Sequence, residues 1–190
     1  MSLKDALEEL EFDFLNKDVK VRILKSLEDV TVLGEAIKPY EPNSEVKLKR
    51  WIALKLVESG VAVFKPGEEL TDEELINAHW REGLQPSTRL SELQGDFYQK
   101  LRLYLRKVKY EAESHGNIQL LEKSKRLVRD IIDSRTRKIV NMAISLSVPQ
   151  ELLQLLTAEE KALYDEIKRI VEFWRSYILD PLKEVGTNGS

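Results

Sequence analysis

The sequence predicts an α+β fold in which a small N-terminal β-rich domain precedes a larger all-α helical bundle domain. Short β-branched runs separated by turn residues occupy the chain up to about residue 86. Beyond that point, amphipathic helical patterns follow one another with few prolines. The composition changes between Gly83 and Gly95, so we place the two domains at residues 1–86 and 87–190.

The β-rich domain begins with an acidic leader, residues 1–15, to which we assign no element. Apolar and charged residues alternate over residues 19–23, which predicts a short strand. A β-branched stretch at residues 30–33 predicts a second strand. Pro39 and Pro42 then bracket a turn.

The rest of this domain alternates between extended and helical patterns. Residues 44–48 predict an extended segment that leads into a helix over residues 49–60, where apolar residues recur at helical spacing. Gly60 is a natural stop for that helix. Residues 61–64 return to strand composition.

Three capping boxes predict the starts of helices. In this motif the side chain of a Ser or Thr and that of a Glu or Gln three residues later bond reciprocally to free backbone amides. The pattern occurs at residues 71–74, 147–150 and 157–160. We therefore expect a helix to begin at each of them.

Apolar stripes define the remaining helices of the bundle. One helix is marked by Phe97, Leu101, Tyr104, Leu105 and Val108. Residues 115–117 form a break, after which a long helix is expected over residues 118–146. The last helix is marked by Leu163, Ile167, Ile170, Val171, Trp174 and Ile178. Three substantial helices with one or two short ones make a bundle.

The sequence contains few of the residues and motifs that catalytic and metal-binding sites use. The chain has no cysteine and two histidines, which excludes disulfides, thiol nucleophiles and thiolate metal sites. It also has no Gly-rich phosphate loop, Gly-x-Ser-x-Gly elbow or His-Glu-x-x-His pair. We therefore expect no enzyme, no catalytic residue, no cofactor and no metal, and we interpret His79 and His115 as ordinary surface or hydrogen-bonded histidines.

The charges are nearly balanced overall but unevenly distributed. The 30 basic and 33 acidic residues give a formal net charge of −3, which argues against a uniformly basic nucleic-acid coat. The leader and residues 65–84 are acidic, whereas residues 123–138 are basic. Every apolar run is far shorter than the roughly 20 residues that span a bilayer, and the N-terminus is unlike a signal peptide. These features predict a cytoplasmic protein without membrane contact.

The basic segment at residues 123–138 supports two interpretations. It is a candidate face for binding DNA. Its basic residues are also spaced four residues from acidic ones, in the pairs Arg126 with Asp130, Arg129 with Asp133 and Asp133 with Arg137. Such pairs stabilise a helix by only tenths of a kcal/mol. We favour a solvated or subunit-paired face over one that binds DNA.

Arg135 differs from its basic neighbours because it lies on an apolar line. That line comprises Val128, Ile131, Ile132, Ile139 and Met142. An unpaired charge in a core costs several kcal/mol, so Arg135 requires a carboxylate partner. The candidates are Glu111, Glu113, Glu159 and Glu166, or a residue of another chain.

Aromatic residues widen the apolar surface of the last helix. Phe173 and Tyr177 flank its main stripe, so this surface exceeds what one contact within the chain would use. We infer a second contact, made to another subunit. The subunit-interface candidates from the whole sequence are Arg129, Asp133, Arg135, Arg137, Phe173, Trp174 and Tyr177.

Several segments together resemble the GINS complex of DNA replication in its archaeal form. They are residues 45–56, 61–64 and 71–75 in the first domain, and residues 96–98, 127–139, 156–160 and 163–164 in the second. Residues 156–160 are also similar to the subunit class with the reverse domain order. Only twelve residues follow Ile178, too few for a trailing β domain, so the chain resembles the class with its small β domain first.

The resemblance implies a non-enzymatic replication factor. Such a subunit assembles with a paralogous GINS subunit in a heterotetramer, and the complex bridges and activates the MCM replicative helicase with a Cdc45/RecJ-like partner. It implies no cofactor, and it leaves direct contact with DNA open.

Two other functions remain as alternatives. The first is a winged-helix-like DNA-binding regulator built on residues 48–64, with Lys47, Lys49 and Arg50 as its basic contacts. The near-neutral charge and the lack of a preceding helix-turn-helix pair count against it. The second is a plain coiled-coil or scaffold protein, which the β-rich first domain disfavours.

Overall fold

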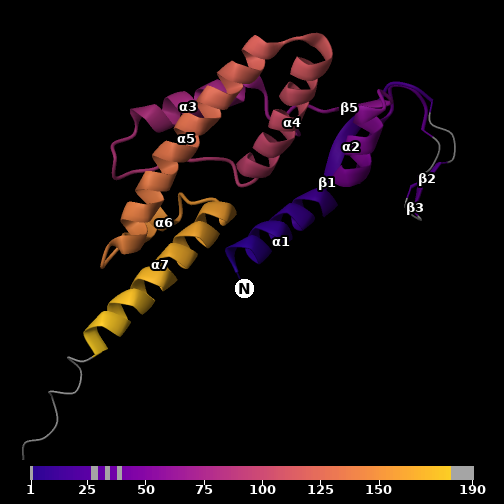
Figure 1. The fold of residues 1–190 in the computed structure, drawn as a ribbon. Coiled ribbons are helices and arrows are strands. Elements are labelled where there is room, and N and C mark those ends of the chain that lie inside the picture. Colours follow the sequence, from indigo (N-terminus) through magenta and orange to yellow (C-terminus); the bar gives the residue numbers. More distant parts are fainter. Residues whose placement is uncertain (1, 27–29, 33–34, 38–39, 181–190) are drawn as a thin grey trace, which may run out of the picture. The chain divides into compact units, whose positions relative to one another are not determined.

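The computed structural model describes residues 2–26, 30–32, 35–37 and 40–180. Figure 1 shows the elements coloured along the chain. Strands and helices are mixed up to residue 64, and the elements that follow are helices. They are α1 (Leu3–Asn16), β1 (Asp18–Ile23), β2 (Val30–Val32), β3 (Glu35–Ile37), β4 (Glu45–Lys49), α2 (Arg50–Glu58), β5 (Ala62–Phe64), α3 (Asp72–Leu84), α4 (Phe97–His115), α5 (Ile118–Ile144), α6 (Gln150–Leu153) and α7 (Ala158–Leu179). The predicted α+β class is confirmed. Leu33, Gly34 and Pro39 lie outside the described residues.

The chain folds into two compact units that interleave along the sequence. The first, here called the helical unit, comprises Met1–Leu7, Leu75–Gly95 and Glu122–Ser190. The second, called the sheet unit, comprises Glu8–Glu74 and Asp96–Leu121. Because each unit draws on separate stretches of chain, this division does not test the domain boundary between residues 86 and 87, which stays a prediction.

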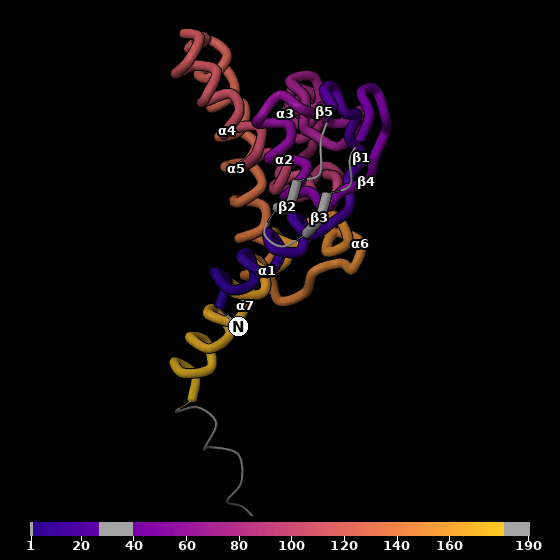
Figure 2. Tube along the Cα trace, turned by 90° about the vertical axis from the view of Figure 1, so that its right-hand side faces the viewer, coloured from indigo at the N-terminus to yellow at the C-terminus, as the bar shows by residue number. Residues whose placement is uncertain are grey.

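An antiparallel sheet of order β4-β1-β5 organises the sheet unit. Val21 of β1 pairs with Val46 of β4 and with Phe64 of β5. Every second residue of β1 is buried, as the alternation of its sequence predicts. Figure 2 shows α2 beside these strands, and its Ile52, Ala53 and Leu56 join the core of the unit. Gly60, at φ +67°, follows the end of α2 in the left-handed region that glycine favours.

The acidic leader forms a helix, α1, that the sequence analysis did not assign. Its Phe14 is fully buried and lies against the guanidinium of Arg50, which is 4.2 Å from the centre of the ring. Two polar contacts join helix α4 of the same unit to Gly67, in the turn after β5, and to Asp72, the first residue of α3. Lys100 Nζ donates to the carbonyl of Gly67 at 2.8 Å, and the Tyr104 hydroxyl donates to Asp72 at 2.8 Å.

Two of the three predicted capping boxes are confirmed. The backbone amide of Thr71 donates to the Glu74 carboxylate, and the amide of Glu74 donates to the Thr71 hydroxyl. The same reciprocal pair joins Thr157 and Glu160 at the start of α7. The box at residues 147–150 is wrong, because Pro149 is the N-cap of α6 and no side chain caps this helix.

The core of the helical unit lies between α5, α7 and the segment after α3. It contains Leu90, Ile139, Met142, Ala143 and Tyr164. The apolar line of α5 and the first half of the α7 stripe meet here, with Leu163 and Ile167 packed at its margin. The break predicted at residues 115–117 is confirmed by Gly116, which ends α4 in the left-handed conformation.

Candidate functional site

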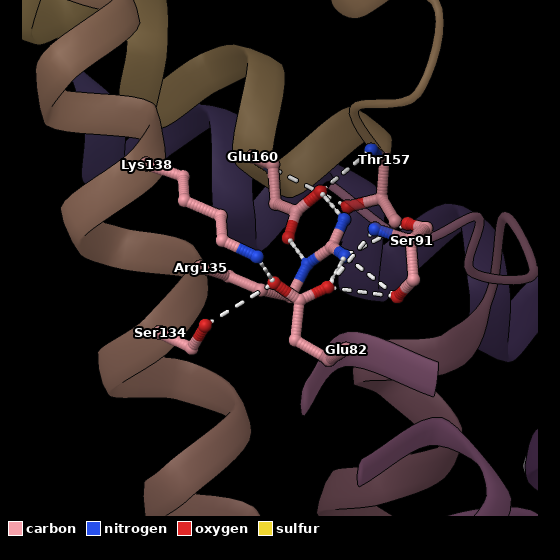
Figure 3. Close-up of polar contacts among 7 residues, drawn as sticks. All are labelled: Glu82, Ser91, Ser134, Arg135, Lys138, Thr157 and Glu160. Atoms are coloured by element: carbon pink, nitrogen blue, oxygen red, sulfur yellow. Dashed lines mark hydrogen bonds and ion pairs between the residues drawn. The ribbon is translucent and has the colours of Figure 1, made fainter. Parts of the chain in front are cut away.

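A cluster of buried charges lies within the helical unit, centred on Arg135 of α5 (Figure 3). Its guanidinium is 1% exposed and forms a two-pronged pair with Glu160 of α7, in which Nε donates to Oε1 and Nη2 donates to Oε2 at 2.8 Å. Its Nη1 donates to Glu82 Oε2 of α3 and to the carbonyl of Ser91, both at 2.8 Å. One side chain therefore ties together three segments of the unit.

Glu82 collects hydrogen bonds from several directions. Lys138, one turn after Arg135, donates to Oε1, and the Ser134 hydroxyl donates to the same atom at 3.2 Å. Both the amide and the hydroxyl of Ser91 donate to Oε2. Burial by itself raises the pKa of Glu82, but the bonds from Lys138 and Ser91 and the charge of Arg135 outweigh it, so that the pKa lies below its usual value. Glu82 is therefore held ionised.

Glu160 has two roles at once. Its carboxylate closes the capping box of α7 by accepting from the amide of Thr157, and it also accepts the two bonds from Arg135. The start of α7 is thereby fixed to the middle of α5. Two cations, Arg135 and Lys138, balance the two carboxylates of Glu82 and Glu160, which is the condition under which buried charges are tolerated.

The sequence located Arg135 correctly but not its partners. Arg135 lies among buried side chains of α5, as predicted, although Ile132 is 42% exposed and so lies off that line. In the part of the chain that the structure describes, the carboxylates that bond Arg135 are Glu82 and Glu160, and neither was among the four predicted candidates. Glu82 was missed, yet its position continues the buried line of Leu75 and Ala78 on α3, a signal that its carboxylate needed a cation.

The predicted surface pairs of α5 do not form among the described residues. Asp130 Oδ2 lies 3.3 Å from Nε2 of His79 on α3. Within the described ranges, no ion pair involves Arg126, Arg129, Asp133 or Arg137. These four side chains are exposed. They stay predicted candidates for contact with another subunit. Arg135 is buried and bonded to groups of its own unit, and its predicted place at a subunit interface stays a prediction.

The second half of α7 presents an uncovered apolar face. We define the α7 face as Ile170, Phe173, Trp174, Tyr177 and Ile178, which recur every three or four residues and are each more than half exposed. The rings of Phe173 and Tyr177 stack with their centres 6.5 Å apart. An aromatic side chain carries about 150–250 Å² of surface. Contiguous exposed apolar patches of this kind often mark a site of protein–protein contact.

No three His, Asp or Glu side chains gather as a metal site would require within the described residues. None of the helices in the described part of the chain has the length and apolar content needed to cross a bilayer.

A family model for the GINS complex protein helical bundle domain, named Sld5, matches residues 67–179. The matched segment is more than half of the chain. The protein belongs to the GINS family. No curated protein matches the chain. The match includes the whole charged cluster around Arg135 and the α7 face, so both belong to the GINS helical bundle domain.

Membership in the GINS family makes the chain a subunit of a DNA replication complex that assembles with other GINS subunits. GINS subunits are structural components rather than enzymes. The winged-helix alternative also conflicts with the structure at Arg50. This side chain is 3% exposed and bonds Glu68 and its backbone carbonyl, so it is not available to DNA. Helix α2 follows strand β4 directly, without a preceding helix-turn-helix partner.

Proposed function

We propose that this chain is the GINS subunit class with its small β domain first, and that it forms a heterotetramer with a paralogous GINS subunit. The α7 face carries this proposal. It lies inside the helical bundle domain, it is apolar and aromatic, and its residues fall on one side of one helix. Burial of such a face against a second helix is the usual way in which helical subunits associate.

The proposed role of the assembled complex is to bridge the MCM replicative helicase and a Cdc45/RecJ-like partner in an archaeal, intracellular replisome. Contacts that favour one arrangement of the helicase raise the population of that arrangement, and no catalytic residue is needed for this. The exposed Arg129, Asp133 and Arg137 of α5 are proposed as polar contacts at the rim of the subunit interface. Direct contact with DNA stays an open prediction.

Paired aromatic substitutions test the role of the α7 face. Co-expression with a paralogous GINS chain should give a complex, and Phe173→Ser with Trp174→Ser should weaken it by about a hundredfold, since buried aromatic anchors carry much of an interface's free energy. Phe12 of α1 is 67% exposed, close to the 70% of Phe173, so Phe12→Ser is the matched control. An unchanged affinity of the double variant would remove the α7 face from the interface.

Helicase assays test whether the assembled complex bridges MCM and a Cdc45/RecJ-like partner. The assembled complex should stimulate DNA unwinding by MCM, and the complex should retain a Cdc45/RecJ-like protein on the helicase. A complex that forms normally but neither binds MCM nor alters unwinding would leave the GINS assembly intact and contradict the bridging role.

A further inference from the structure

An open cavity of about 470 Å³ lies in the helical unit beside α3, on a different element from the α7 face. Its lining residues are Arg81, Gln85, Arg89, Leu90, Ser91, Glu92 and Leu155. Leu90 and Ser91 are buried, and Ser91 bonds Glu82 and Arg135 beneath. The lining is therefore joined through Ser91 to the buried charged cluster, whereas Arg81 and Arg89 are exposed.

The two arginines of this cavity form no ion pair with any residue that the structure describes. Glu92 is the single acidic residue of the lining, so the cavity carries a net positive charge. Its volume accommodates a few side chains and falls within the range of known binding pockets.

An apolar stripe runs along α3 next to the cavity. Ile76, Trp80 and Leu84 are four residues apart, so they follow one side of the helix, and Trp80 and Leu84 are 64% and 61% exposed. Arg81 is the residue after Trp80 and lies about 100° further round the helix. Arg81 therefore adjoins the stripe, and it lines the cavity together with Arg89. We call the stripe and the cavity together the α3 surface.

We propose that the α3 surface binds an acidic amphipathic helix of a partner protein. The apolar side of that helix covers Trp80 and Leu84, and an Asp or Glu carboxylate enters the cavity between Arg81 and Arg89. Arginine forms two-pronged bonds with carboxylates, which gives this contact orientation as well as attraction. A basic helix is excluded by repulsion from the same arginines.

Peptide binding to the full-length chain tests this proposal. The probe is a fluorescein-labelled helix of about 20 residues with Leu along one side and Glu elsewhere. A matched peptide carries Lys in place of every Glu. Fluorescence anisotropy should show binding of the Glu peptide that weakens with salt, and binding of the Lys peptide should be undetectable.

Two double variants distinguish binding of the peptide at the α3 surface from general electrostatic attraction between the peptide and the protein. Arg81→Glu with Arg89→Glu should weaken binding of the Glu peptide by at least about tenfold, and Trp80→Ala should weaken it by a similar factor. Arg126→Glu with Arg137→Glu makes the same change of charge on α5 and should alter binding by less than about twofold. Equal weakening by both double variants, no binding, or equal binding of the two peptides would overturn the proposal.

Formation of the complex with the paralogous GINS chain distinguishes the α3 surface from the α7 face, which is the proposed subunit contact. The variants of the α3 surface should leave the complex with the paralogous GINS chain intact, whereas the α7 variants should disrupt it. Loss of assembly on changing Arg81 and Arg89 would show that the α3 surface is itself a GINS subunit interface and would refute a separate acidic partner.

Discussion

A buried arginine anchors each of the two units, but the groups that surround it differ. In the helical unit, Arg135 meets two buried carboxylates, Glu82 and Glu160, and shares one of them with Lys138. In the sheet unit, Arg50 meets one carboxylate, Glu68, and lies over the ring of Phe14. Glu68 has a side chain that is 23% exposed, so water reaches this pair.

The difference shows two ways of keeping a cation inside a small protein. Arg135 depends on charges that have no access to water, so losing any one of them leaves another uncompensated. Arg50 relies on packing against an aromatic ring and on the carbonyl of Glu68 as well as on charge. Stability of the helical unit should therefore be the more sensitive to single charge substitutions and to pH.

The largest expected effect is that of Arg135→Ala. The variant leaves Glu160 and part of Glu82 without a cation, and breaking a buried pair in this way costs about 3–5 kcal/mol of unfolding free energy. Urea unfolding followed by circular dichroism measures the loss. Arg137→Ala, two residues along the same helix but exposed, is the control and should change stability by less than about 0.5 kcal/mol. Similar values for both variants would contradict the role of the cluster.

Arg50→Leu should have a smaller effect in the sheet unit. It removes the ion pair with Glu68 and the contact with Phe14, but Glu68 can turn to water, so the expected loss is about 1–3 kcal/mol. The same unfolding experiment applies. A loss larger than that of Arg135→Ala would reverse the proposed order of the two units.

Acid should reduce the contribution that the buried charge of Glu82 makes to the stability of the helical unit. Because the folded protein lowers the pKa of Glu82 below the ordinary value of 4.5, the stability from this group is fully present above that pH. It is lost as the pH falls through the lower folded pKa. The stability difference between the wild type and Glu82→Gln should therefore shrink between pH 7 and pH 3.

Glu122→Gln serves as the control for that titration. The pKa of Glu122 is also lowered, chiefly by its hydrogen bond from Lys125, but this pair is on the surface. Its stability difference from the wild type should stay near zero throughout the pH range. A constant difference for Glu82→Gln would show that the charge of Glu82 does not support folding.

The smallest effect concerns the helix caps. Thr157→Ala removes the confirmed cap of α7 and should cost about 1 kcal/mol. Ser147→Ala should change stability by less than about 0.5 kcal/mol, because Pro149 occupies the cap position of α6. Equal losses in thermal unfolding would restore the predicted cap at Ser147.

Local patterns predicted most elements because they act over a few residues. The alternation in β1, the turn at Gly116 and the cap at Thr157 each depend on neighbours in sequence. Helix α1 was missed although Leu3, Leu7, Leu10 and Phe14 recur at helical spacing, since its acidic composition suggested only a leader. The box at Ser147 failed because a proline already stood at the helix start.

The partners of Arg135 could not be predicted from patterns of neighbouring residues. Glu160 is 25 residues away and Glu82 is 53 residues away, so helix packing alone decides which carboxylates reach the guanidinium. The position of Arg135 on an apolar line did predict a carboxylate partner, and the structure shows two, Glu82 and Glu160. The stripe of α7 shows the reverse case. The sequence predicted this stripe, and the structure reveals that its first half packs into the core while its second half is exposed.

The subunit role is tested most directly by the native mass of the full-length chain co-expressed with a paralogous GINS chain. We predict a heterotetramer with two copies of each chain, which separates into smaller species when Phe173→Ser and Trp174→Ser are introduced together. A mass equal to that of the single chain, in the presence of a folded paralogue, would contradict the proposed assembly.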